Sequence, residues 1–540
     1  MREYIVTLKN FDDLEAFYED METPGGNLYI PDRSVDCVNR RNISRNTHYM
    51  LTDEEAEQIR NDPRVIACNL KPEELGMEII RHWSQTSENW DKSSTISSNQ
   101  KNWGLLRCIE GTQRSNWGID GSTNQTGTVT INAEGRNVDI VIIDGMINPN
   151  HPEFAKNSDG TGGTRVIQYN WLQHAATPGT YVYTPYVDIN DFYRTDDNDH
   201  GCHVAGTAAG NSQGWARQAN IYNINPYSTD PNGLDTLLLF DYIRAWHNSK
   251  PINPITGRRN PTICNNSWGY GYSIPINQIT QVNWRGTNYT SNLNSATLNS
   301  YGVYNNGSTA KVPARYDTLE ADIIDAMNDG IIMVGAAGNA SYKIEVPNGT
   351  DYNNYLIWLY QGIYQFQIYY HQGMAPTSVE KHIVVGAIGT FKDDRKVTFS
   401  NCGPRVDIFA PGTQIISSVN TSETSFNYAA DPRNTNFYFN KYSGTSMASP
   451  QVCGLLACIL EVYPDLNQDT ARDYLNKTSK VNQITSTSGG YSDLQDLQGS
   501  PNKYLAYFKE RPDTGSIWPK LNYKPRPSSG RLFPRQRIRR

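Results

Sequence analysis

The run Val138–Ile143 constrains the fold of this 540-residue chain more than any other stretch. All of its residues except Asp139 are valine or isoleucine, and such a near-continuous β-branched run is typical of a central parallel strand that is buried on both faces. Further strand candidates alternate with helix candidates along the chain. They are Asn220–Ile224, Thr262–Asn265, Ile331–Val334 and His382–Gly386 for strands, and Leu234–His247 and Asp317–Asn328 for helices. We therefore predict an α/β fold with an open, mostly parallel sheet and helices on both faces.

A crowded run of small residues, Ser443–Pro450, leads directly into another helix pattern. Apolar residues then recur at helical spacing, at Val452, Leu455, Leu456, Ile459, Leu460 and Tyr463. Pro450 is expected in the first turn, and Pro464 is expected to stop the helix. Ser446 would then stand at a helix N-terminus, where free N–H groups favour a developing anion. Taken alone, the stretch is explained better as a Ser/Thr helix cap.

Three polar residues occupy the positions where an open α/β sheet presents functional groups. Asp144 follows the strand at Val138–Ile143, His200 begins a helix pattern, and Ser446 begins another. Each has a plain structural explanation, as a turn residue, an exposed histidine and a helix cap. Their joint occurrence in the order Asp, His, Ser favours a catalytic site.

Five segments resemble the motifs of the subtilisin-like serine proteases (subtilases, peptidase family S8). They lie in the order of that family over roughly residues 100–470, and they read VIIDGMINPNHPEF, HGCHVAGTAAG, GAAGNAS, FSNCGPRVDIFAPG and GTSMASPQVCGLLACIL. The resemblance implies a serine endopeptidase that works through an acyl-enzyme. Ser446 would attack the scissile carbonyl, His200 would take its proton, and Asp144 would orient the imidazole. Asn339 would donate to the oxyanion of the tetrahedral intermediate.

The same resemblance implies a substrate-binding set. Ser267, Trp268 and Gly269 match the segment that pairs with the substrate backbone, and Gly335, Ala336, Ala337 and Gly338 complete the set. Trp268 would line an apolar-accepting specificity pocket, and a plain core tryptophan is the alternative. The pocket floor is hidden by the insertions described next.

Four regions are expected along the chain. Residues 1–70 form a small α+β, ferredoxin-like domain whose segments YIVTLK and LTDEEAEQIRNDPRVIAC resemble an inhibitor-type propeptide. Residues 71–100 are a linker, within which self-cleavage would fall. Residues 101–490 are the catalytic domain, with insertions near 270–315 and 341–377 at the rim of the site, and 491–540 are an irregular, basic, Pro-rich tail. The enzyme would thus be made as a zymogen, its own N-terminal domain being an intramolecular inhibitor.

Composition excludes several classes of protein. The net charge of −7 gives no sign of a nucleic-acid binder, and no apolar run is long enough to span a membrane. The N-terminus lacks a hydrophobic signal segment, so synthesis in the cytoplasm is expected. The cysteines form no CxxC pair, which favours free, mostly buried thiols over zinc or disulfides.

Two departures from the family pattern bear on chemistry. Cys202 replaces a threonine beside the catalytic histidine, and its thiol would be either redox-sensitive or an inert small side chain. Glu153 matches a calcium-ligand position of the family, but the other ligands are not evident. We expect no required cofactor and no metal ligands at this site, and a structural calcium elsewhere stays open.

Two other functions stay open from the sequence. The chain could be a particle-associated structural protein, phage-encoded and carried on the virion, with a subtilase domain that is active or silent. Its basic tail would then dock an acidic partner, a particle or nucleic acid, whereas the plain alternative is a solubilising tail. It could also be an inactive protease kept for binding, against which the intact triad and Asn339 argue.

Overall fold

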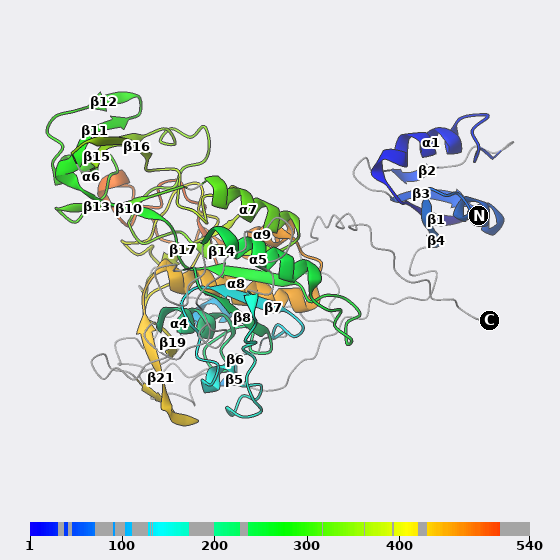
Figure 1. Ribbon diagram of the computed structural model, residues 1–540, viewed down its shortest axis with the longest axis horizontal. Helices are drawn as coiled ribbons and strands as arrows, with labels where there is room; N and C mark the ends of the chain where they lie inside the picture. The colour runs from blue at the N-terminus through cyan, green and yellow to red at the C-terminus, as the bar shows by residue number, and fades with distance from the viewer. Residues whose placement is uncertain are drawn as a thin grey trace. The chain divides into compact units, whose positions relative to one another are not determined.

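The computed structural model describes two compact units, an N-terminal one and a larger one (Figure 1). The described residues are 1–30, 37–40, 46–70, 90–91, 103–110, 128–129, 131, 133–171, 199–226, 236–315, 317–360, 362–390, 394–419 and 429–507. The expected linker lies mostly outside these ranges, and so does the basic end of the chain after Tyr507. We describe each unit by itself.

The N-terminal unit is a four-stranded antiparallel sheet with two helices. Its elements are β1 (Arg2–Leu8), α1 (Leu14–Glu22), β2 (Cys37–Arg40), β3 (Asn46–Leu51), α2 (Asp53–Arg60) and β4 (Val65–Leu70). The strand order β2-β3-β1-β4 with this βαββαβ sequence confirms the ferredoxin-like prediction. Thr52 and Glu55 form the capping box that begins α2. Strand β2 was not predicted, because it is short and lies in a polar stretch.

The larger unit is built on an eight-stranded sheet in the order β22-β23-β18-β17-β14-β9-β7-β8. Its strands are β7 (Asp139–Ile143), β8 (Asn220–Ile224), β9 (Thr262–Asn266), β14 (Ile332–Ala336), β17 (Ile383–Ile388), β18 (Ile408–Pro411), β22 (Lys480–Val481) and β23 (Lys503–Tyr504). All neighbours are parallel except β22 and β23. Every residue of β7 is buried, as its β-branched run predicted.

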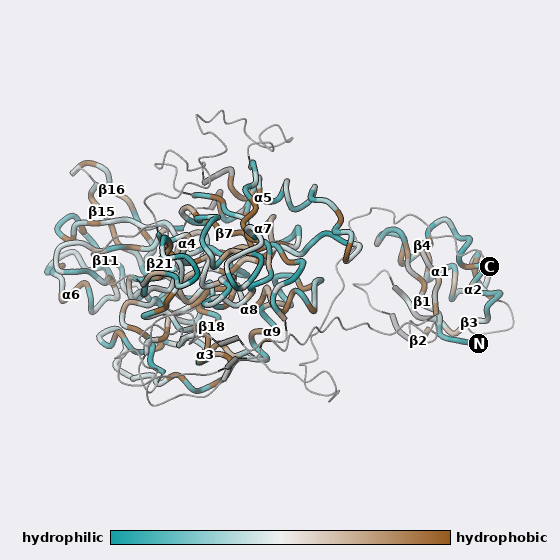
Figure 2. Tube along the Cα trace, turned by 90° about the horizontal axis from the view of Figure 1, so that it is seen from below, coloured by the Kyte–Doolittle hydropathy of each residue, from teal (hydrophilic) through white to brown (hydrophobic). Residues whose placement is uncertain are grey.

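Helices cover both faces of this sheet. The helices are α3 (Trp103–Glu110), α4 (Asp199–Ala209), α5 (Thr236–Ser249), α7 (Asp317–Asn328), α8 (Thr445–Val462) and α9 (Gln468–Thr478). On one face α4 and α8 pack together, and α8 lies along β9, β14 and β17; on the other, α5 packs on α7 (Figure 1). Figure 2 shows hydrophobic segments running through the interior of this unit, around β7 and α8. Although α8 is long and apolar enough to cross a membrane, 89% of it is buried, so we assign it to the core.

The start of α8 corrects one detail of the sequence prediction. The helix begins at Thr445, so Pro450 is its sixth residue and lies beyond the first turn. Proline cannot donate to the carbonyl one turn back, and that carbonyl, Ser446 O, instead accepts a hydrogen bond from Ser267 Oγ at 3.0 Å. The helix ends at Val462, directly before Tyr463 and Pro464, as predicted.

The two insertions join into one β-rich subdomain at one end of the larger unit (Figure 1, upper left). Its elements are β10 (Gly271–Pro275), β11 (Ile279–Trp284), β12 (Thr287–Tyr289), α6 (Ser295–Ser300), β13 (Thr309–Pro313), β15 (Tyr355–Tyr360) and β16 (Tyr364–Tyr369). A four-stranded sheet in the order β12-β11-β15-β16 draws strands from both insertions, and Val282 and Leu356 share its core.

One buried carboxylate ties this subdomain together. Asp351 is fully buried and accepts hydrogen bonds from Arg285 Nε (2.7 Å), Lys343 Nζ (2.7 Å) and Tyr491 Oη (2.8 Å). Burial alone would raise the pKa of Asp351, but these donors hold it well below its ordinary value. The carboxylate therefore connects the first insertion, the second insertion and the segment near Tyr491.

The folded chain extends past residue 490, where the tail was expected to begin. Strand β23 pairs with β18, and its Tyr504 is fully buried. Leu505 N donates to Phe409 O at 2.8 Å, and Tyr507 N donates to Cys108 O at 2.9 Å. A two-residue strand is too short to give a periodic signal, which explains why the boundary was placed too early.

Candidate active site

Asp144 and His200 meet where β7 ends and α4 begins. The Nδ1 atom of His200 lies 2.8 Å from Asp144 Oδ1, which also accepts a hydrogen bond from Gly145 N at 2.7 Å. Asp144 is fully buried, while the His200 side chain is 31% exposed. A Cβ atom at Gly201 would lie 1.9 Å from Gly145 O, so glycine is required for α4 to approach this closely.

The environment of His200 favours its protonated form. Burial pushes the pKa of the imidazole down, but the charge and the hydrogen bond of Asp144 outweigh burial and raise the pKa above 6.5. The second carboxylate oxygen of Asp144 is buried and accepts no hydrogen bond from any described residue. Its unshared charge lies next to the imidazole, where it can stabilise an imidazolium.

Ser446 is the second residue of α8, the helix that packs on α4. It is buried except for 7% of its surface, and its Oγ donates to Ser267 O at 3.1 Å. Ser267 follows β9, the neighbour of β7 in the sheet, and its own Oγ donates to Ser446 O. The ends of β7 and β9 therefore bring Asp144 and the segment that holds Ser446 to the same edge of the sheet.

Asn339 lies in the turn after β14, beside the start of α8. Its Oδ1 accepts hydrogen bonds from Thr445 N and Thr445 Oγ1, both at 2.8 Å, which fixes the direction of its Nδ2. A Cβ atom at Gly444 would lie 3.4 Å from Asn339 Nδ2 and 3.5 Å from Ser446 N. Two N–H donors thus border the same space next to Ser446, as an oxyanion site requires.

The predicted substrate-binding residues divide into two groups. Gly269 and Gly338 line a pocket of about 310 Å³, together with the predicted oxyanion residue Asn339. Gly335–Ala337 do not line it, because Gly335 and Ala336 pair within the sheet and Ala337 N donates to Val385 O at 2.9 Å. Ser267 holds the start of α8 in place, through both its carbonyl and its hydroxyl.

Trp268 lies in the hydrophobic core and is only 9% exposed. It is not among the residues that line the 310 Å³ pocket, so the core alternative describes it better than the specificity-pocket prediction. An edge-to-face contact with Tyr270, at a ring distance of 5.9 Å, connects it to the pocket wall.

Several pocket residues were not predicted from the sequence. Tyr272, Lys311 and Val312 come from the first insertion, and Met374 comes from the end of the second. A Cβ atom at Gly269 would lie 2.5 Å from Met374 Sδ, so this glycine makes room for the methionine. No motif marks Tyr272, Lys311 and Val312, because they reach the site only through the pairing of β10 with β13.

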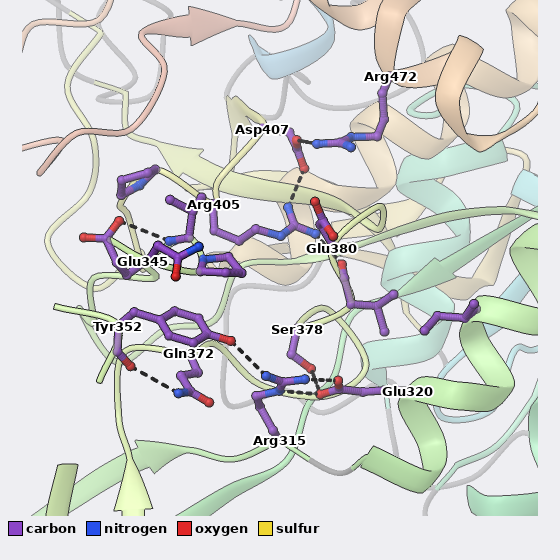
Figure 3. Close-up of a pocket in the computed structure, with 16 residues that line it drawn as sticks. Arg315, Glu320, Glu345, Tyr352, Gln372, Ser378, Glu380, Arg405, Asp407 and Arg472 are labelled. Atoms are coloured by element: carbon purple, nitrogen blue, oxygen red, sulfur yellow. Dashed lines mark hydrogen bonds and ion pairs between the residues drawn. The ribbon is translucent and has the colours of Figure 1, made fainter. Parts of the chain in front are cut away.

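A second pocket, of about 620 Å³, lies elsewhere on the larger unit and contains none of the predicted site residues (Figure 3). Several of its charged side chains pair with each other along its walls (Figure 3). Arg315 Nε donates to Glu320 at 2.9 Å, and Arg472 donates to Asp407 at 2.6 Å. Because this pocket contains none of the predicted site residues, the 310 Å³ pocket is the candidate active site.

Glu153 does not offer a free carboxylate for a metal ion. It is fully buried, and it accepts hydrogen bonds from Ser212 N (2.9 Å), Ser212 Oγ (2.6 Å), Gln213 N (3.0 Å) and Arg433 Nη2 (2.6 Å). Arg433 lies between β20 (Ala429–Asp431) and β21 (Asn434–Tyr442) and also binds Asp431. The guanidinium supplies the positive charge that a cation would otherwise bring. Among the described residues, no cluster of three metal-binding side chains is found.

The Cys202 thiol is shielded from solvent. It is fully buried, and burial raises its pKa to about 12. Its Sγ lies 3.7 Å from Ser418 Oγ. Because little thiolate forms below that pH, the structure favours the inert alternative over a redox-sensitive one.

Comparison with known proteins extends these observations. Residues 135–500 match the profile Peptidase_S8, described as the subtilase family. Alkaline protease 1 of Aspergillus clavatus is 26% identical over 396 residues, which cover 72% of this chain and 67% of that protein. Alkaline serine exoprotease A of Vibrio alginolyticus is 23% identical over 451 residues, covering 82% of this chain and 57% of that protein.

A crystal structure of a cold-adapted subtilisin-like serine proteinase is also similar. It is 21% identical, with a TM-score of 0.45, and the match covers 76% of this chain and 100% of that one. The family profile spans well over half of the present chain. The chain therefore belongs to the subtilase family, and it is a serine endopeptidase that hydrolyses peptide bonds.

Proposed function

We propose that Asp144, His200 and Ser446 are the catalytic triad of this endopeptidase and that Asn339 supports the oxyanion. The observation that carries the proposal is the 2.8 Å contact between Asp144 Oδ1 and His200 Nδ1. In the proposed mechanism His200 Nε2 exchanges the proton, and α8 presents Ser446 beside α4. The nearby pocket supplies a place for a substrate side chain.

The reaction follows from these positions. Ser446 Oγ attacks the scissile carbonyl carbon as its proton passes to His200 Nε2, and negative charge collects on the carbonyl oxygen. Asn339 Nδ2 and Ser446 N donate to that oxygen. His200 then gives the proton to the leaving amine, which breaks the C–N bond and leaves an acyl-enzyme. Water attacks the acyl carbon with His200 again taking a proton, and Ser446 is released as the hydroxyl.

The N-terminal unit supports a further part of the proposal, that the chain is made as a zymogen. A separate ferredoxin-like unit precedes the protease unit in the chain. We propose that it is an intramolecular inhibitor and that the protease cuts it off within residues 71–100. Mass spectrometry of the N-terminus of the purified chain tests this. Processing removes the N-terminal unit, whereas an unprocessed chain retains Met1.

The pH dependence of activity should follow His200. The imidazole must be neutral to accept the Ser446 proton, and Asp144 raises its pKa above 6.5 despite burial. We expect kcat/KM to rise with pH with a midpoint above 6.5, measured on a short peptide at constant ionic strength. This rise of kcat/KM with pH cannot come from His203, His371 or His382, because burial lowers the pKa of each. A midpoint below 6.5 would contradict the assignment.

Removing the Asn339 amide should slow turnover. We expect Asn339→Ala to lower kcat by about 10²- to 10³-fold with little change in KM, because the lost donor acts only when the oxyanion forms. The matched variant Asn339→Asp retains an Oδ1 acceptor for Thr445 but replaces the donor with another oxygen. It should be at least as slow as Asn339→Ala. Recovery of activity in Asn339→Asp would show that positioning of Thr445, and not donation, is the role of this residue.

A further inference from the structure

The hydrophobic face of hairpin β15–β16 continues beyond the core of the subdomain. Leu356 pairs with Ile368, and both are buried in that core. The next pairs on the same face are Trp358 with Phe366 and Tyr360 with Tyr364, because side chains alternate along a strand. Phe366 is 47% exposed and Tyr360 is 38% exposed. The hairpin thus presents aromatic rings to solvent where the core ends.

These rings form one continuous surface, which we call the aromatic ladder and define as Tyr272, Trp358, Tyr360 and Phe366. Trp358 contacts each of the other three, with ring centroids 5.7 Å from Tyr272, 4.8 Å from Tyr360 and 6.0 Å from Phe366. The sequence from Tyr355 to Tyr370 contains no acidic, basic or histidine residue. An uncharged, partly exposed aromatic surface of this kind marks an interaction site.

The ladder begins at the proposed active site. Tyr272 lines the 310 Å³ pocket together with Gly338 and Asn339, and on its other side it contacts Trp358 of the hairpin. A polypeptide that places one side chain in the pocket therefore has a continuous aromatic surface beside it. Because the ladder is continuous with the pocket, we take the polypeptide substrate as the molecule that binds it.

We propose that the aromatic ladder docks an extended, apolar or aromatic segment of the polypeptide substrate, beyond the residue held in the pocket. The proposal rests on the proposed function, because it takes the pocket beside Asn339 as part of the substrate cleft. Aromatic rings bind neighbouring apolar and aromatic side chains with little loss of conformational freedom. The enzyme would therefore favour unfolded protein chains over short peptides.

The test compares a long substrate with a short one in the full-length enzyme. The variant Tyr360→Ser/Phe366→Ser should raise KM for unfolded casein about five- to tenfold, with kcat unchanged. Its kcat/KM for a four-residue chromogenic peptide should stay within about twofold of the wild type, which also shows that the variant is folded. The matched control is Tyr369→Ser, because Tyr369 is 39% exposed on the same hairpin but lies on the opposite face with Tyr355. The control should leave both substrates unaffected.

A binding measurement separates failure of this proposal from failure of the proposed function. In a Ser446→Ala background, the anisotropy of labelled casein should show the same five- to tenfold weaker binding for the ladder variant. If the wild type cleaves nothing while this loss of binding persists, the catalytic proposal fails and the docking proposal stands. Unchanged casein kinetics and binding in the ladder variant, or equal losses on casein and the short peptide, would overturn docking. Loss of self-association or of binding to phosphatidylcholine vesicles, with casein unaffected, would also overturn it and reassign the surface.

Discussion

Ser446→Ala should lower turnover of peptide substrates on the order of 10⁶-fold, because it removes the only atom proposed to attack the carbonyl. The same change should stop processing within residues 71–100, so that the purified chain keeps its N-terminal unit. The Oγ atom makes one described hydrogen bond, to Ser267 O at 3.1 Å, so the fold should survive its loss. Peptide hydrolysis and the mass of the purified chain measure both effects.

A nearby serine provides the control for this experiment. Ser443 is exposed, three residues before Ser446, and its Oγ accepts a hydrogen bond from Gln414 N at 3.0 Å. Ser443→Ala should retain activity within a few-fold of the wild type, and its N-terminal unit should be removed as before. Hydrolysis by Ser446→Ala at a rate near that of the wild type would refute the triad. If Ser446→Ala loses its N-terminal unit only when active enzyme is added, one molecule cleaves another.

Arg433→Met should lower the free energy of unfolding of the larger unit by about 3–5 kcal/mol, because it leaves two buried carboxylates without their shared cation. Arg433 is 8% exposed, and Glu153 and Asp431 are fully buried. Burial raises the pKa of Glu153, but Arg433 and Ser212 outweigh it and hold that pKa below 4.5. The stabilisation is therefore present above pH 4.5 and is lost as the pH falls through the lower folded-state pKa.

Urea denaturation in a Ser446→Ala background measures this effect without self-digestion. Tryptophan fluorescence reports on the larger unit, since residues 1–70 contain no tryptophan. Lys381→Met is the matched control, because its pair with Asp469 is more than half exposed and should contribute less than about 1 kcal/mol. We also expect a calcium chelator to leave the unfolding midpoint unchanged if Arg433 alone balances Glu153. An unchanged free energy of unfolding in Arg433→Met would contradict this account.

The sequence predicted the parts of the fold whose signals are local. The β-branched run at Val138–Ile143 identified the buried strand β7, and the Thr52–Glu55 capping box identified the start of α2. Asp144 and His200, predicted from short motifs, do lie within hydrogen-bond distance of each other. The strand and the capping box depend on neighbouring residues, so spacing reveals them, whereas the pairing of Asp144 with His200 was implied by the resemblance to the subtilases.

The features that the sequence did not predict depend on distant pairing. Arg433 and Glu153 are 280 positions apart, and nothing in either segment indicates the other. Likewise, β11 pairs with β15 from the second insertion, which each insertion read separately could not show. Pro450 was wrongly predicted in the first turn because the helix begins earlier, at Thr445 within the run of small residues. The pairing of Arg433 with Glu153 and of β11 with β15 could not be predicted, because the sequence does not indicate which distant segments are in contact.

The contacts of Asp351 constrain how the two insertions can evolve. Arg285, Lys343 and Tyr491 converge on one carboxylate from three separate stretches of the gene product. Deleting either insertion would leave buried charged groups without their partners. It would also expose the apolar core residues of the insertion that remains. The two insertions should therefore be gained, lost or transplanted into a homologous protease only together, and the docking surface proposed above should move with them.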